Sequence, residues 1–367
     1  MKKPKFISLA LIAISLFAIW RGLTADFLAN DDARLRNPAS QIVASSGING
    51  YLEPVEVVAS PSSLPSMSAW RPNDPYLGEQ WALEQIQASK LWQTTTGGSQ
   101  ILVAVLDTGI SQEHEDLNGQ VVGGMNFTSS STEGDFNGHG THVAGIIAAT
   151  SNNGLGIVGL APESRLLNVK VADDKGECCI PAVAAGIIWA VYSGASVINI
   201  SLQFAEPSPE LERAVNFAWN KGAVIVAAAG NNSGDQPVYP AAYENCIAVT
   251  AIRQNDTLAP LANYGGWVDV AAPGVNIYAT QPGNSYGYQN GTSFASAYVS
   301  GLAALLFTVA TDTDNNGRLN DEVRLAVEAG CQEIGVDGVG EGRIDAVNSM
   351  AEIIAASKPT GVLTLQL

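Results

Sequence analysis

Short apolar runs recur along the middle of the chain and alternate with longer segments rich in small residues. The runs carry almost no charge, which is typical of strands buried on both faces of a parallel sheet. They lie at residues 101–106, 165–171, 196–201, 223–229, 246–252 and 267–272. The intervening segments predict helices at residues 143–149, 181–192, 208–222 and 293–309. Strands that alternate with helices predict an α/β fold with a doubly wound, mostly parallel sheet, covered by helices on both faces in three layers.

The N-terminus has a different composition. Three lysines precede an uncharged apolar run at residues 6–20, and a small-residue cleavage site ends at Ala25. This pattern predicts a signal peptide at residues 1–25 and an exported protein, either secreted or at the cell surface. The run is short for a membrane span. A retained N-terminal anchor is the alternative and would be the chain's one contact with a membrane.

The rest of the chain divides by composition. Residues 26–72 are punctuated by prolines and rich in serine, as expected for a pro-region or linker. Residues 73–358 carry the alternating pattern and form one predicted domain, and residues 359–367 are a C-terminal tail.

The net charge of the chain limits which kinds of molecule it can bind. With 35 acidic and 18 basic residues the net charge is −17, which argues against a nucleic-acid partner, because such partners need basic patches. We expect a monomer.

The four cysteines allow three disulfide connectivities, and the sequence does not choose among them or exclude free thiols: Cys178, Cys179, Cys246 and Cys331.

Candidate chemistry gathers at strand ends and helix starts. His139 and His142 lie in the glycine-rich segment 137–145, at the mouth of a predicted helix. A histidine there could be a catalytic base, because its pKa lies near neutral pH, or it could be a core residue. In parallel sheets, ligands bind beyond the carboxyl ends of the strands, where Asp107 and Asn231 are found.

A candidate nucleophile stands at the start of the last long apolar helix. Ser293 follows Gly291-Thr292, and the free N–H groups of a helix N-terminus favour developing negative charge. Ordinary helix capping also explains a serine at this position.

Several segments resemble the active-site blocks of subtilisin-like serine proteases. These segments are Asp107-Thr108-Gly109, residues 138–145 and residues 291–296, in that family's order. Residues 227–231 resemble the block that contains the oxyanion-hole asparagine. The resemblance covers about residues 73–350, and residues 73–76 and 218–222 are similar to the thermitase branch in particular. Matches to all of these blocks in order are much more specific than a match to one.

The resemblance implies a role for each matched residue. Ser293 would attack the scissile carbonyl, His139 would accept its proton, and Asp107 would orient the imidazole. Asn231 and the Ser293 N–H would bind the oxyanion. The implied activity is a serine endopeptidase that acts on polypeptides through an acyl-enzyme. A weak or inactive peptide-binding module is the alternative, because Gln203 and Tyr298 depart from the family pattern.

The resemblance also implies where a peptide binds. In the family, the peptide adds a strand to backbone edges. The matching substrate-binding positions are Ser201, Leu202, Gln203, Ala228, Gly230 and Val238. The family usually has glycine where Gln203 stands, so this side chain is expected to crowd or reshape the groove. A branched apolar residue at Val238 implies uncharged substrate residues of moderate size.

A structural calcium ion is implied in the same way. The matching ligands are the side chains of Asp74, Asp116 and Asn153 and the carbonyls of Leu155 and Ile157. Oxygen-only ligands suit calcium, although a glycine-rich turn beside surface carboxylates would look similar. Residues 312–317 resemble the start of an EF-hand loop. Val323 replaces its final glutamate, so we expect a turn or at most a weak ion site there.

Overall fold

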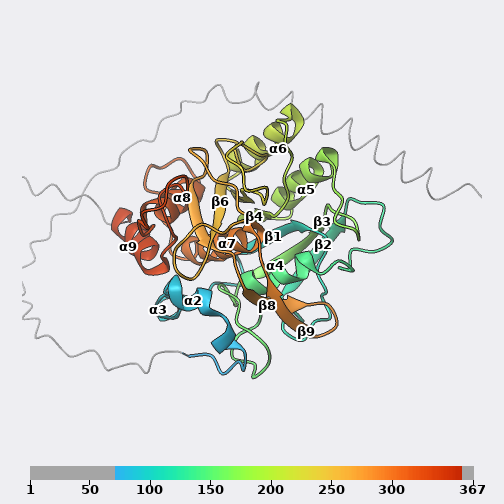
Figure 1. Ribbon diagram of the computed structural model, residues 1–367, viewed down its shortest axis with the longest axis horizontal. Coiled ribbons are helices and arrows are strands. Elements are labelled where there is room, and N and C mark those ends of the chain that lie inside the picture. Colours follow the sequence, from blue (N-terminus) through green and yellow to red (C-terminus); the bar gives the residue numbers. More distant parts are fainter. Residues whose placement is uncertain (1–70, 358–367) are drawn as a thin grey trace, which may run out of the picture. The chain divides into compact units, whose positions relative to one another are not determined.

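The computed structural model describes residues 71–357 (Figure 1). The predicted signal peptide at 1–25, nearly all of the segment 26–72 and the tail at 359–367 lie outside these residues. Among the described helices, none has the length and apolar character needed to cross a membrane.

The core of the domain is a parallel sheet of seven strands in the order β2-β3-β1-β4-β5-β6-β7. Its strands are β1 (Leu102–Asp107), β2 (Val121–Asn126), β3 (Arg165–Lys170), β4 (Val197–Ile200), β5 (Val224–Ala228), β6 (Ile247–Ile252) and β7 (Val270–Pro273). Each predicted apolar run supplies one of them, because a strand covered on both faces has to be apolar throughout. The chain winds from β1 first toward β2 and later toward β7, so β1 and β4 flank the point where the strand order reverses.

Helices cover both faces of this sheet. The helices are α4 (His139–Ala148), α5 (Ile180–Tyr192), α6 (Pro209–Asn220) and α7 (Thr292–Phe307). Val103 and Val105 of β1 join α4 and α7 in one apolar core. Leu106 points the opposite way, toward Gly186 of α5. Successive residues of a strand point to opposite faces of the sheet. β1 therefore contacts one helical layer through Val103 and Val105 and the other through Leu106, which gives three layers. Figure 1 shows α7 crossing the sheet near its centre.

Other elements complete the domain and were not predicted. They are the short helices η2 (Leu77–Glu79), α2 (Trp81–Gln85) and α3 (Ala88–Leu91), the hairpin β8 (Ile277–Gln281) and β9 (Ser285–Gln289), and α8 (Asn320–Ala329) and α9 (Ala346–Ala356). Strand β2, at the edge, has the sequence Val-Val-Gly-Gly-Met-Asn and is mostly half-exposed. Elements of this kind lack the continuous apolar run that marks a central strand.

We expect the stability lost when a side chain is truncated to depend on how deeply that side chain is buried. Leu302→Ala on α7 removes a fully buried side chain and should lower the free energy of unfolding by about 2–5 kcal/mol. Leu325→Ala on α8 makes the same chemical change at a side chain that is 68% exposed and should cost far less. Denaturant melts of the two variants test this, and equal losses would contradict the placement of α7 in the core.

Candidate functional site

Three strand ends and two helix starts meet at one edge of the sheet. Asp107 ends β1 and bonds to His139 at the start of α4. Ser201 follows β4 and donates its hydroxyl to the carbonyl of Ser293 at 3.2 Å. Asn231 follows β5 and accepts from Thr292 at the start of α7. The structure therefore brings together all four residues for which a catalytic role was predicted.

Asp107 and His139 form a short polar pair at the centre of this site. His139 Nδ1 lies 2.7 Å from Asp107 Oδ1, and the carboxylate is fully buried while the imidazole is 27% exposed. The backbone N–H of Thr108 also donates to Asp107 Oδ1, at 2.7 Å. The ring of Phe294, next to Ser293, lies 5.5 Å from the imidazole ring. His139 is thus held by β1 on one side and adjoins the first turn of α7 on the other.

Asp135 holds the start of α4 and was not predicted to do so. Gly138 occupies the N-cap position with a left-handed φ of 97° and has no side chain to cap the helix. Asp135 accepts the N–H of Gly138 at 2.8 Å and that of Thr141 at 2.9 Å. It also accepts the hydroxyl of Thr108 at 2.9 Å, which ties α4 to the end of β1. The distance in sequence between this aspartate and the helix obscured its capping role.

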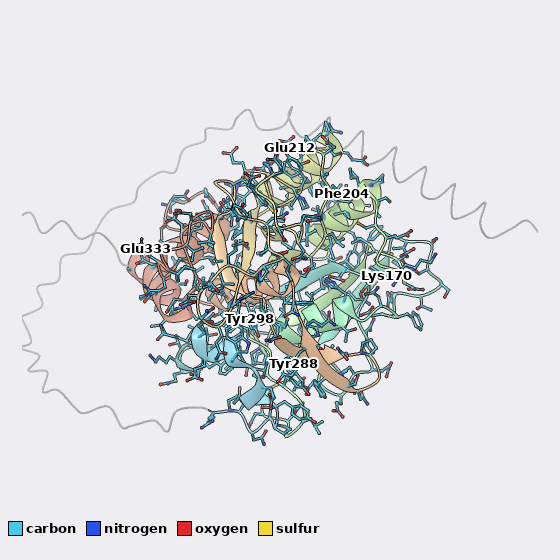
Figure 2. The ribbon with its side chains drawn as sticks, in the orientation of Figure 1. Lys170, Phe204, Glu212, Tyr288, Tyr298 and Glu333 are labelled. Atoms are coloured by element: carbon cyan, nitrogen blue, oxygen red, sulfur yellow. The ribbon has the colours of Figure 1, made fainter. Side chains whose placement is uncertain are left out.

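A buried lysine supports the same junction. Lys170, labelled in Figure 2, ends β3 beside Asp107, and its ammonium group donates to the carbonyls of Thr108 and Gly134. It forms an ion pair with Asp174 at 2.9 Å. A fully buried lysine is tolerated only when its charge and donors are satisfied, so these contacts fix the turn after β1.

The two neighbouring histidines have opposite electrostatic environments. Burial lowers the pKa of His139, but the charge and hydrogen bond of Asp107, with a further contribution from Asp135, outweigh burial and raise it above its usual value. Burial lowers the pKa of His142 to about 4, and its Nε2 lies 3.1 Å from the carbonyl of Ile277. His139 is therefore the stronger base of the two, whereas His142 stays neutral in the core.

The first turn of α7 orients Asn231. Its amide oxygen accepts the backbone N–H of Thr292 at 2.9 Å and the hydroxyl of the same residue at 3.1 Å. That hydroxyl also accepts the N–H of Gly230 at 3.0 Å. Because both bonds use the oxygen of Asn231, its NH₂ group is the end of the side chain that can face a ligand. A helix N-terminus beside it adds further N–H donors.

Buried polar side chains fix β4 against α7 beneath Ser293. Ser201 accepts a hydrogen bond from Asn199 at 2.9 Å, and Ser300 donates to Asn199 at 2.9 Å. The hydroxyl of Ser296 donates to the Ser293 carbonyl at 2.8 Å. A fully satisfied network of this kind rigidifies its surroundings.

The remaining predicted substrate positions lie on the loops after β4 and β5. Leu202 is half-buried and Gln203 is exposed on the first loop, whereas Ala228 is buried at the end of β5. Val238 is buried just before the cis peptide bond between Tyr239 and Pro240.

The predicted calcium ligands also converge. Asp74 accepts the N–H groups of Asn152 at 2.7 Å and Asn153 at 3.3 Å. Asp116 accepts the side-chain amide of Asn153 and the N–H of Ile157, both at 2.8 Å. The amide oxygen of Asn153 accepts the N–H of Leu155 at 2.8 Å. One loop, residues 152–157, thus wraps both carboxylates.

The electrostatics of this loop fit a cation. Asp74 is 5% exposed and Asp116 is fully buried. Burial raises the pKa of Asp74, and the charge of Asp116 adds to the rise against the lowering effect of the backbone N–H donors. Two buried carboxylates beside an asparagine amide offer the oxygen ligands that calcium prefers.

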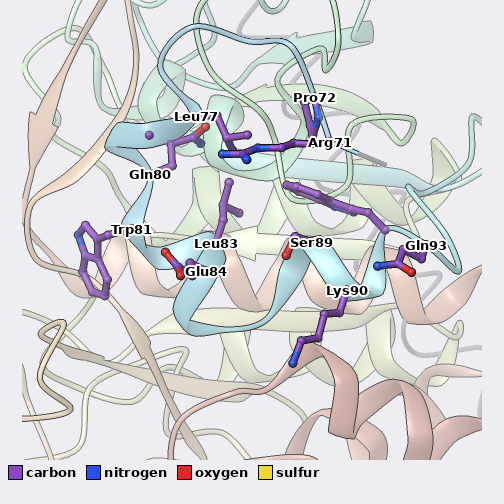
Figure 3. Close-up of a pocket in the computed structure, with 12 residues that line it drawn as sticks. Arg71, Pro72, Leu77, Gln80, Trp81, Leu83, Glu84, Ser89, Lys90 and Gln93 are labelled. Atoms are coloured by element: carbon purple, nitrogen blue, oxygen red, sulfur yellow. The ribbon is translucent and has the colours of Figure 1, made fainter. Parts of the chain in front are cut away.

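Two other features of the described residues stand apart from this chemistry. Carboxylate oxygens of Asp312, Asp314 and Glu322 lie within 4.8 Å of one another in the EF-hand-like segment. A cavity of about 520 Å³, shown in Figure 3, is lined by residues between Arg71 and Gln93. It contains none of the residues that meet at the sheet edge.

Known proteins resemble this chain over most of its length. The model of the Subtilase family matches residues 98–323. The chain is 46% identical over 287 residues to the thermophilic serine proteinase of Bacillus sp. (strain AK1). The aligned region covers 77% of this chain and 70% of that protein. It is 43% identical over 285 residues to thermitase of Thermoactinomyces vulgaris, covering 77% and 99% of the two chains. A solved protease structure from Pseudoalteromonas arctica PAMC 21717 matches with a TM-score of 0.70 and 31% identity, over 78% of this chain and 99% of that one.

The two histidines should be separable by titration. We expect NMR to show His139 titrating above the ordinary value of about 6.5 and His142 near pH 4. Asp107→Asn removes the charge that raises the pKa of His139 and should lower that pKa while leaving His142 nearly unchanged. The reverse order of the two histidines would contradict the electrostatic description of the site.

Proposed function

The chain belongs to the subtilase family of serine endopeptidases, and we propose that it hydrolyses polypeptides through Asp107, His139 and Ser293. The observation that carries this proposal is the 2.7 Å contact between His139 and the buried Asp107, beside the helix start that bears Ser293. A base with a raised pKa, a group that orients it and a hydroxyl at a helix N-terminus are the parts that acyl transfer needs.

The proposed reaction proceeds in two steps. Ser293 Oγ attacks the scissile carbonyl while its proton passes to His139, and Asp107 stabilises the imidazolium. The NH₂ group of Asn231 and the Ser293 N–H donate to the oxyanion. His139 then gives the proton to the leaving amine as the C–N bond breaks. Water, deprotonated by His139, attacks the acyl-enzyme, and His139 returns the proton to Ser293 Oγ as the acyl C–O bond breaks.

The peptide-binding alternative rests on Gln203 and Tyr298. Tyr298 is 1% exposed in the core of α7, where a bulky residue changes packing and does not obstruct the site. Gln203 lies on a loop that contacts substrate in this proposal, so it bears on which peptides bind. Neither departure removes a group that the reaction uses, and the endopeptidase is the better-supported function.

We further propose that the protein is exported and monomeric, with residues 1–25 as its signal peptide and residues 26–72 as a pro-region or linker. The charge pattern and apolar run at the N-terminus support export. A retained anchor would place the same domain, residues 73–358, at the cell surface.

A calcium ion held by Asp74, Asp116, Asn153 and the carbonyls of Leu155 and Ile157 is also proposed. Such an ion would supply positive charge between the two buried carboxylates and stabilise the loop that wraps them. It would take no part in proton transfer, which Asp107 and His139 carry out.

Covalent labelling tests the nucleophile. A fluorophosphonate probe should label the protein, and Ser293→Ala should lose both label and peptide hydrolysis. Ser89→Ala removes an exposed serine on α3 and should keep both. Asn231→Ala should still fold but lose kcat by about 10²–10³-fold, a magnitude known from subtilisin, which is a member of this family. Labelling that persists in Ser293→Ala would exclude this serine as the nucleophile.

Calcium removal tests the metal site. Because a ligand at 100 times its Kd stabilises the folded state by about 2.7 kcal/mol, EGTA should lower the Tm of the full chain. Asp116→Asn should abolish this calcium dependence, and Asp337→Asn, at an exposed carboxylate, should keep it. Dependence that survives in Asp116→Asn would move the ion elsewhere, for example to the carboxylates of Asp312, Asp314 and Glu322.

A further inference from the structure

Two loops leave neighbouring strands and lie beside Ser293, with a gap between them that one side chain crosses. The loop after β4 begins at Ser201, whose hydroxyl donates to the Ser293 carbonyl. The loop after β5 begins near Gly230, whose N–H donates to the Thr292 hydroxyl. β4 and β5 are adjacent in the sheet, so these loops lie next to each other as well as to the nucleophile. Because these loops carry the predicted substrate-binding positions Gln203 and Gly230, the proposed function places the peptide side chain next to the reacting carbonyl between them.

The side chain of Gln203 crosses this gap. Its Nε2 donates to the side-chain oxygen of Asn232 at 2.6 Å, which joins the first loop to the second. Its Oε1 lies over Gly230, so close that a Cβ atom built there would be 1.8 Å away. Gly230 also has a φ of 94°, which disfavours any other residue. The space that a glycine leaves open at this wall is therefore filled by the glutamine carboxamide.

Both ends of this connection are fixed by backbone contacts. Phe204, labelled in Figure 2, exchanges two backbone hydrogen bonds with Tyr239, at 2.7 and 2.9 Å. The N–H of Asn232 donates to Asn263 at 2.9 Å, and Asn263 donates to the carbonyl of Ala229 at 2.8 Å. Gln203 itself is exposed, so it can swing outward, but only with loss of its bond to Asn232.

We propose that Gln203 is a specificity-determining residue that bridges the two loops. It favours glycine, alanine or serine as the substrate residue whose carbonyl is attacked. This inference rests on the proposed endopeptidase function and names its substrate class. A small side chain fits beside the carboxamide. A larger one has to displace the carboxamide from Gly230 and break the hydrogen bond to Asn232, so leucine and phenylalanine are disfavoured.

The test compares matched peptides that differ only at the residue before the cleaved bond. Using full-length protein with active sites counted by the fluorophosphonate, kcat/KM for alanine should exceed that for leucine and phenylalanine by on the order of 10-fold or more. Gln203→Gly opens the gap and should reduce this preference by about 10-fold, through faster cleavage after the large residues. The sites cut in a denatured protein mixture should change in the same direction.

Three further variants separate bulk from hydrogen bonding. Gln203→Met keeps the side-chain volume and should keep much of the preference for alanine. Asn232→Ala removes the acceptor and should give an intermediate profile. Gln236→Gly removes an exposed glutamine from the same loop as Asn232, bonded to its neighbour Asp235, and should leave the profile unchanged.

The possible failures are distinguishable. A protein that takes no label and cleaves nothing would overturn the proposed function and this inference with it. A labelled, active protein that cleaves after leucine or phenylalanine as fast as after alanine would overturn the proposed role of Gln203 but not the proposed function. If Gln203→Gly does not fold, the wild-type profile and Asn232→Ala still decide the question.

Discussion

The hydrogen bond between Asp107 and His139 joins the end of β1 to the first turn of α4, and the rest of the site depends on that junction. Asp107 is fully buried, and burying a carboxylate is costly unless it is paired and hydrogen-bonded. His139 and the Thr108 N–H provide those contacts at Oδ1, while the buried Oδ2 accepts no hydrogen bond from the described residues. Removing either member of such a pair leaves an uncompensated group in the interior, so the contact couples the electrostatics of the site to the stability of the fold.

The surroundings of this pair are arranged so that charges of opposite sign lie on opposite sides of His139. Asp107 and Asp135 raise its pKa from the side of β1. On the other side, the N-terminus of α7 and the amide of Asn231 present N–H donors. In the proposed reaction, a proton that moves from Ser293 to His139 would move toward the carboxylates, while the negative charge left behind would develop near the donors. This preorganisation exists before substrate binds, because buried hydrogen bonds hold each part.

The sequence predicted those parts of the fold that a local pattern specifies. The six apolar runs became six strands of the sheet, with β7 at its edge and the other five inside it, because a strand between two helical layers has no exposed face. β2 was missed, since Gly123 and Gly124 and a half-exposed face leave it without such a run. The site was predictable because its residues stand in short motifs at strand ends and helix starts. The cap supplied by Asp135 was not, because Gly138 occupies the usual capping position.

The two departures from the family pattern show where sequence reasoning has to stop. In the sequence, Gln203 and Tyr298 were both simple departures from the family pattern. In the structure, one is exposed on a loop and the other is buried in the core. Tyr298 is enclosed in the apolar core of α7, where its size is accommodated by neighbouring side chains. Gln203 is exposed and bonds to Asn232, 29 positions away in the chain, on a neighbouring loop. No local pattern encodes a contact between two loops. The proposed chemistry of this protein follows from its motifs, whereas its proposed choice of peptide follows from side chains that only the folded loops bring together.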